Sequence, residues 1–180
     1  MNKKGISALV VVAIVVIAVV VVGVVAYYML TSGGGGEENG GGEEGNGVAE
    51  ANSLTFDVTA TVSGAEEFDK FTVTNLQSGG ILLRVDQTDA QGNDFTYILN
   101  QTAQSAWANA MGTGFIDDSA NYQTYADNAL IGYVALDGYI QELANWSGSG
   151  DYDFTHNGDS FVISNIYLNP EIPESVFLPA

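Results

Sequence analysis

The residues that could carry out chemistry are few and widely separated. His156 is the only histidine, the chain has no cysteine, and no Gly-x-Ser-x-Gly sequence occurs. Nucleophilic catalysis needs a nucleophile next to an activating base, and these residue types offer no such pair. We therefore expect no catalytic residue and no enzymatic activity, and we interpret His156 as a strand histidine beside a turn.

Pairs of acidic residues are the remaining chemical candidates. Glu66-Glu67, Asp117-Asp118 and the Asp151-Tyr152-Asp153 segment could bind a divalent cation or transfer protons. However, adjacent acids in turns are usually solvated, and the last segment lacks the spacing of an EF-hand loop, where glycine falls at the sixth position. We expect no metal site and no cofactor.

Two sequences fit the acceptor pattern for N-glycosylation. They are Asn100-Gln101-Thr102 and Asn145-Trp146-Ser147. Modification would require surface loops and a host that glycosylates its surface proteins. Asn100 and Asn145 are therefore candidate modification sites.

The charge of the chain is strongly negative, with a formal net charge of −18 and only four basic residues. Such a surface repels nucleic acid and anionic headgroups, so we expect no nucleic-acid partner. The acidity is compatible with solubility in a salty setting and with an archaeal surface protein. The sequence identifies no protein partner.

A long apolar segment near the N-terminus predicts the topology. Residues 6–30 contain no charged side chain, and a helix of this length can cross a hydrocarbon core of about 30 Å. Lys3 and Lys4 precede it, so the positive-inside rule keeps residues 1–5 in the cytoplasm. The alternative is a cleaved secretory signal, but apolar regions of such signals are typically about 7 to 15 residues long. We expect a retained single-pass anchor in the cell membrane.

The rest of the chain divides into a linker and one domain. Residues 31–47 are rich in Gly and Glu and have almost no apolar side chain to bury, which predicts a flexible linker. Residues 48–180 are long enough for one compact domain. The topology places this domain outside the cytoplasm, either extracellular or periplasmic.

Alternating apolar and polar residues predict a series of β-strands in this domain. Asn157-Gly158 between the last two strands favours a type I′ turn. The expected strands cover 54–62, 68–76, 81–85, 95–99, 105–108, 114–116, 152–156 and 160–168.

Apolar residues spaced by three or four between Tyr122 and Leu143 predict an amphipathic helix of about seven turns. Gly132 or Gly138 could break it into two. The expected fold class is α+β, with a single N-terminal transmembrane helix followed by a curved antiparallel β-sheet packed with one or two helices.

Two resemblances suggest a function. Lys3-Lys4-Gly5-Ile6-Ser7 resembles the cleavage region of archaeal type IV prepilins, with processing after Gly5. The order of elements, the stretch from Tyr97-Ile98-Leu99-Asn100 to Trp107, and the Asn-Pro-x-Ile-Pro-x-Ser-Val-Phe tail resemble the periplasmic lipoprotein-carrier, or LolA-like, superfamily. The first implies a structural pilin subunit. The second implies a domain that binds lipid or another apolar ligand on the concave face of a half-open sheet.

The LolA-like resemblance also implies which residues line the ligand cavity. These are large apolar side chains on one strand face and on the facing helix, although the same side chains could simply fill a core. The candidates are Phe56, Phe71, Tyr97, Trp107, Tyr133 and Ile140. We carry forward two hypotheses: a membrane-anchored extracytoplasmic binding domain and, as the alternative, a pilin-like surface subunit.

Overall fold

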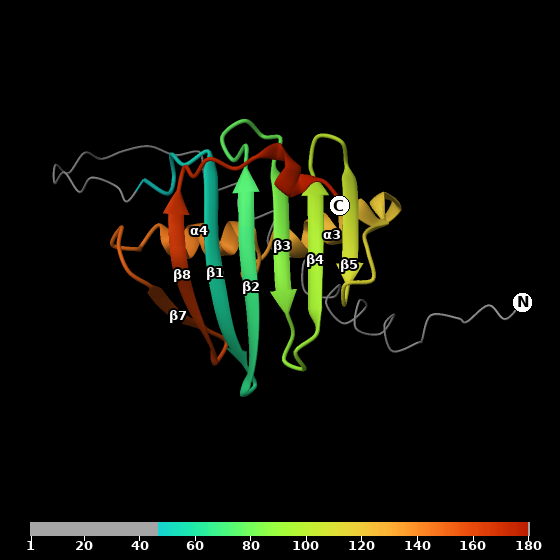
Figure 1. The fold of residues 1–180 in the computed structure, drawn as a ribbon. Helices are drawn as coiled ribbons and strands as arrows, with labels where there is room; N and C mark the ends of the chain where they lie inside the picture. The colour runs from blue at the N-terminus through green and yellow to red at the C-terminus, as the bar shows by residue number, and fades with distance from the viewer. Residues whose placement is uncertain (1–46, 180) are drawn as a thin grey trace, which may run out of the picture. The chain divides into compact units, whose positions relative to one another are not determined.

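The computed structural model of the protein describes residues 47–179. In this part of the chain, eight strands form one antiparallel sheet in the order β6-β5-β4-β3-β2-β1-β8-β7 (Figure 1). The first six strands form a meander, and β8 returns to pair with β1. The strands are β1 (Ser53–Val62), β2 (Ala65–Thr74), β3 (Leu82–Thr88), β4 (Asp94–Asn100), β5 (Ser105–Ala110), β6 (Ile116–Asp117), β7 (Tyr152–His156) and β8 (Asp159–Leu168).

The two α-helices and the C-terminal tail lie on opposite faces of this sheet (Figure 1). We call the face that carries the two α-helices the inner face, and the opposite one the outer face. The tail, residues 170–178, crosses the outer face and is called the strap; its 3-10 helix η3 contacts β3 and β4. The helical elements are η2 (Ser119–Asn121), α3 (Tyr122–Ala129), α4 (Leu136–Leu143) and η3 (Glu174–Phe177).

The alternation of the strand sequences explains how the two faces differ. Leu54, Phe56 and Val58 of β1 are fully buried on the inner face, whereas Thr55 and Thr59 between them point to the outer face and are half-buried. The strands expected from this alternation are confirmed, with ends that shift by up to three residues.

The turn between β7 and β8 is also confirmed. Asn157 and Gly158 both have positive φ, 53° and 92°, as a type I′ turn requires. This turn sets the antiparallel register that pairs His156 with Asp159.

The predicted fold class is wrong. Within residues 47–179 the structure is mostly a single eight-stranded antiparallel sheet, and α3 and α4 have only eight residues each. None of the helices in the described residues is long and apolar enough to cross a membrane. The predicted transmembrane helix, residues 6–30, and the prepilin-like residues 3–7 lie outside the described residues.

Of the two alternatives predicted for residues 122–143, the one with a break near Gly132 is confirmed and the single long helix is wrong. Gly132 has a φ of 140°, which ends helical geometry after α3. Asp137 then fixes the connection, because its Oδ1 accepts hydrogen bonds from the backbone N–H groups of Gly132 and Gly138, each at 2.7 Å. The second helix therefore starts only at Leu136, after a non-helical connection.

We expect Gly138→Ala to destabilise the domain by about 1 to 3 kcal/mol, although alanine normally stabilises a helix interior relative to glycine. A Cβ at this position would press on the Tyr133 carbonyl oxygen and lie 2.5 Å from the Gly132 carbonyl oxygen. Urea unfolding of the full-length chain measures the effect. Gly148→Ala gives the contrast of backbone strain without a close contact, because its Cβ would have open space but its φ is 86°. An increase in stability for Gly138→Ala would contradict the close packing.

Candidate functional site

Two of the predicted cavity residues, Phe56 and Phe71, lie in a closed aromatic core. Their exposed fractions are 0% and 4%. The two rings stack with centroids 4.8 Å apart, and the ring of Tyr139 from α4 meets them edge-on at 5.8 and 5.3 Å. The three rings fill the space between the sheet and α4, so the side chains of Phe56 and Phe71 are core residues.

Tyr97 and Ile140 lie at the margins of the same inner-face core. Both are partly buried against it. The ring of Tyr97 is 5.8 Å from that of Tyr125 on α3. Ile140 belongs to α4. Among the described aromatic residues, Tyr97 has ring contacts with Phe95 and Tyr125 and none with Phe56 or Phe71.

Tyr133 is not on the helical face that the sequence predicted, because it precedes α4. Its ring stacks on His156 with centroids 3.4 Å apart. Its hydroxyl donates a hydrogen bond to Glu142 Oε1 at 2.5 Å. Burial, followed by this bond to a carboxylate, raises the pKa of Tyr133 to about 12. Tyr133 therefore fastens the α3–α4 connection to β7.

Trp107 lies on the outer face, away from the other five candidates. It pairs with Ile98 of β4, which in turn pairs with Arg84 of β3. Residues directly opposite each other share a face of the sheet. The structure therefore does not bring the six predicted residues together.

The two predicted glycosylation sites differ in their surroundings. Asn100 ends β4 and is half-buried, and its Oδ1 accepts a hydrogen bond from the backbone N–H of Ala103 at 2.9 Å. Asn145 follows α4 and is exposed. Of the two acceptors, Asn145 is the more accessible.

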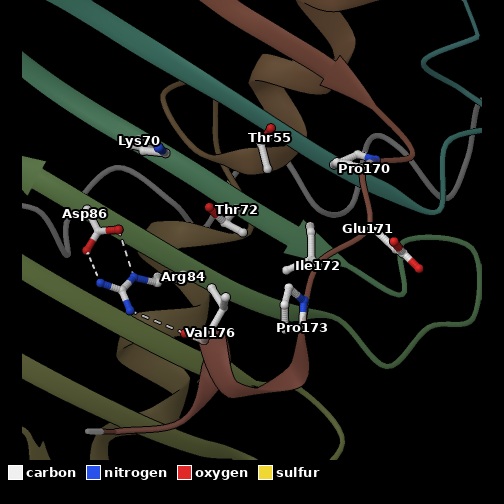
Figure 2. A pocket seen from close by; sticks show the side chains of 10 residues that line it. All are labelled: Thr55, Lys70, Thr72, Arg84, Asp86, Pro170, Glu171, Ile172, Pro173 and Val176. Atoms are coloured by element: carbon white, nitrogen blue, oxygen red, sulfur yellow. Dashed lines mark hydrogen bonds and ion pairs between the residues drawn. The ribbon is translucent and has the colours of Figure 1, made fainter.

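The outer face carries a groove of about 420 Å³ between the sheet and the strap (Figure 2). Strands β1, β2 and β3 form its floor, and the strap forms one wall. Figure 2 shows Lys70 on the far side of the groove from Ile172 and Pro173. The lining residues are Thr55, Lys70, Thr72, Arg84, Asp86, Pro170, Glu171, Ile172, Pro173 and Val176.

The strap is fixed to the sheet at both ends. At its start, the Ser53 hydroxyl donates to the Pro170 carbonyl oxygen at 2.8 Å, and the Asn169 N–H donates to the Ser53 carbonyl oxygen at 2.8 Å. At its end, Phe177 is 5% exposed, and Ile98 on the outer face beneath this region is 0% exposed. Proline at 170 and 173 keeps the segment between these points extended. The wall that the strap forms is thus fixed in position on the sheet.

Arg84 is neutralised inside the groove. Its Nε donates to Asp86 Oδ2 and its Nη2 donates to Asp86 Oδ1, both at 2.8 Å. The hydrogen bond to Asp86 raises the pKa of Arg84 further, so the guanidinium remains charged. Nη1 also donates to the Val176 carbonyl oxygen at 3.4 Å, which links the ion pair to the strap. Thr96 donates a further hydrogen bond to Asp86 Oδ1 at 2.8 Å.

Lys70, by contrast, forms no ion pair with any described residue. Asp57 and Asp86 stand directly opposite it on the neighbouring strands. Asp86 is bound by Arg84, and Asp57 Oδ2 accepts a hydrogen bond from Asn165 at 2.7 Å. The ammonium group of Lys70 is exposed and available to an incoming group.

The groove does not follow from the apolar stripes of the strands, because those stripes lie on the helix-facing side of the sheet. A signal was present: Lys70 and Arg84 are the only basic residues between 47 and 179, and both fall at polar positions of alternating strands. Their position on the same face follows from the strand pairing, in which Thr72 lies opposite Arg84 and Lys70 opposite Asp86. The strap that forms the wall of their groove could not be placed by periodicity.

Comparison with protein-family models, with curated proteins and with solved structures finds no match to this chain, so these comparisons show neither the LolA-like nor the prepilin resemblance.

Proposed function

We propose that residues 48–180 form an extracytoplasmic, non-catalytic binding domain whose ligand occupies the strap groove. The observation that carries this proposal is the groove of about 420 Å³, which contains both cations of the described residues. Its volume lies within the range of about 300 to 1,000 Å³ that is usual for small-molecule sites. The membrane anchor at residues 6–30 remains a prediction from the sequence.

The groove suits an amphipathic ligand. One side offers the Lys70 ammonium and the hydroxyl groups of Thr55 and Thr72, and the strap offers the apolar side chains of Ile172 and Val176. A polar end and an apolar end of one molecule could therefore be held at the same time. The closed Phe56–Phe71–Tyr139 core favours this outer-face site over the inner-face cavity that the sequence analysis expected.

Photoaffinity labelling of the full-length chain in lipid nanodiscs tests this location. The probes are octanoate and octanamide that each carry a diazirine group, and labelled peptides are identified by mass spectrometry. We expect labels on the strap and on the outer-face residues of β1 to β3. Labels on α3 and α4 would instead place the site on the inner face, and labelling that unlabelled octanoate and octanamide both fail to displace would refute a binding site.

A matched pair of substitutions on β1 sharpens this test. Thr55→Phe puts a large ring into the groove, whereas Thr59→Phe puts the same ring on the same face of the same strand outside it. Both residues are half-buried threonines, and phenylalanine is well tolerated in strands. We expect Thr55→Phe to abolish strap labelling and Thr59→Phe to preserve it.

A further inference from the structure

We propose that the ligand of the groove is a singly charged carboxylate with an apolar chain, and that Lys70 binds its carboxylate group. This inference rests on the proposed function and specifies the chemical class of the ligand.

The charges favour an anion at this one place. The chain has a formal net charge of −18, so an anion is repelled from most of its surface. Lys70 and Arg84 are the exceptions between residues 47 and 179, and they lie in the same groove. These two cations share the groove with Asp86 and Glu171, so its lining carries no net charge and repels an anion less than the rest of the acidic surface does.

The hydrogen bonds leave one cation uncompensated. Two nitrogens of Arg84 already bind both carboxylate oxygens of Asp86. Lys70 has three ammonium donors and no ion pair among the described residues. Lys70 is therefore the cation of the groove that can still pair with an anionic head group, while Glu171 in the wall and Asp57 opposite Lys70 limit the negative charge that the site accepts.

A phosphate monoester fits this site less well than a carboxylate. It carries about −1.5 to −2 charges at neutral pH, so part of its charge would be left without a partner. Asp57 stands opposite Lys70, and Glu171 lies in the groove wall. Both carboxylates would repel the second negative charge of the phosphate. A carboxylate carries one charge and can also accept hydrogen bonds from the hydroxyl of Thr72 or Thr55.

The strap supplies the apolar part of the site. Ile172, Pro173 and Val176 line the wall across the groove from Lys70 (Figure 2). A carboxylate at Lys70 directs its attached chain toward these side chains. Contact between the chain and the strap removes apolar surface from water and adds affinity in proportion to the area buried.

Equilibrium dialysis of the full-length chain in nanodiscs, corrected with empty nanodiscs, tests the ligand class. The probes are octanoate, octanamide and octyl phosphate, which share one chain and differ in head group. We expect octanoate to bind about tenfold more tightly than octanamide, as one charge-assisted contact of about 1.4 kcal/mol would give. Octyl phosphate should bind more weakly than octanoate.

Substitutions at Lys70 assign the preference to its side chain. Lys70→Gln should bring the affinity for octanoate down to that for octanamide, and Lys70→Arg should retain most of the difference. Gln91→Glu changes the net charge by the same amount as Lys70→Gln, but at an exposed turn outside the groove, and should leave the affinities unchanged.

The outcomes separate this inference from the proposed function. Equal binding of octanoate and octanamide, with labels still on the strap, would overturn the carboxylate and leave the binding site intact. Tighter binding of octyl phosphate would overturn the single-charge argument. An unchanged octanoate preference in Lys70→Gln would remove Lys70 from the site. Absence of displaceable strap labelling by either photoprobe would refute the binding function itself.

Discussion

Phe56→Ala should lower the free energy of unfolding of the domain by about 3 to 5 kcal/mol. Phe56 is 0% exposed and stacks on Phe71 beneath Tyr139. Its removal therefore leaves a cavity between β1, β2 and α4 that the surrounding side chains cannot easily fill. Urea unfolding of the full-length chain, followed by circular dichroism, measures the change. The loss should appear as a lower midpoint with an unchanged slope.

Phe68→Ala is the matched control for this prediction. Phe68 lies on β2 of the same sheet but is 40% exposed, so the same truncation should cost about 1 kcal/mol or less. A similarly small loss for Phe56→Ala would mean that the inner face has room for a ligand. That result would restore Phe56 and Phe71 as candidates for a ligand wall.

The strands of this domain could be predicted because their information is local. A half-buried strand needs only alternation of apolar and polar residues, which β1 shows from Leu54 to Val62. The Asn157-Gly158 turn needs only two residues that accept positive φ. Neither feature depends on what packs on the sheet.

The helices could not be placed from the same kind of pattern. Apolar spacing across residues 122–143 continues through Gly132, but the helical backbone does not. The break depends on Asp137, whose carboxylate bonds back to the Gly132 N–H, a tertiary detail that periodicity does not report. The predicted shared helical face of Tyr133 and Ile140 is wrong, because Tyr133 lies in the connection between the two helices and only Ile140 belongs to α4.

The candidate site was hidden for a related reason. Alternation tells which residues share a face, and so it could have placed Lys70, Thr72 and Arg84 together. It does not tell which distant segment covers that face. The strap does so through the Ser53–Pro170 hydrogen bond and the burial of Phe177, both of which join residues far apart in the sequence. Trp107 was assigned to the wrong face for a different reason: its face depends on the register between β5 and β4, which alternation within one strand does not give.

One polar residue on the inner face is not explained by the binding site. Asp69 of β2 lies on the same face as Phe71, and its Oδ1 is buried without a hydrogen-bond partner. Burial raises the pKa of Asp69 to about 6; a hydrogen bond with Gln87 opposes the rise, and the nearby charge of Glu67 adds to it. Its charge in turn contributes to the raised pKa of Tyr139, for which burial is the main cause. An ionised Asp69 therefore opposes the packing of the aromatic core.

This placement makes the stability of the domain depend on pH in a defined direction. The pKa of Asp69 is higher in the folded chain than its ordinary value of 3.8. Between about pH 4 and pH 6 the folded state holds a proton that the unfolded state has lost, so stability falls as pH rises through this window. Above it the loss is complete, and at about 1.4 kcal/mol per pKa unit it amounts to about 2 to 3 kcal/mol.

Asp69→Asn should therefore stabilise the domain by about 2 to 3 kcal/mol at pH 7 and by little at pH 4. Asparagine keeps the shape of the side chain and its hydrogen bond with Gln87 but carries no charge to bury. The informative quantity is the difference in unfolding free energy between variant and wild type, measured by urea unfolding from pH 4 to pH 7, because other carboxylates cancel in it. Asp151→Asn, at an exposed carboxylate, removes the same charge from the chain and should show a much smaller difference. A difference for Asp69→Asn that is flat across this range, or destabilisation at pH 7, would mean that Asp69 is ionised without cost and that water reaches its Oδ1 in the folded protein.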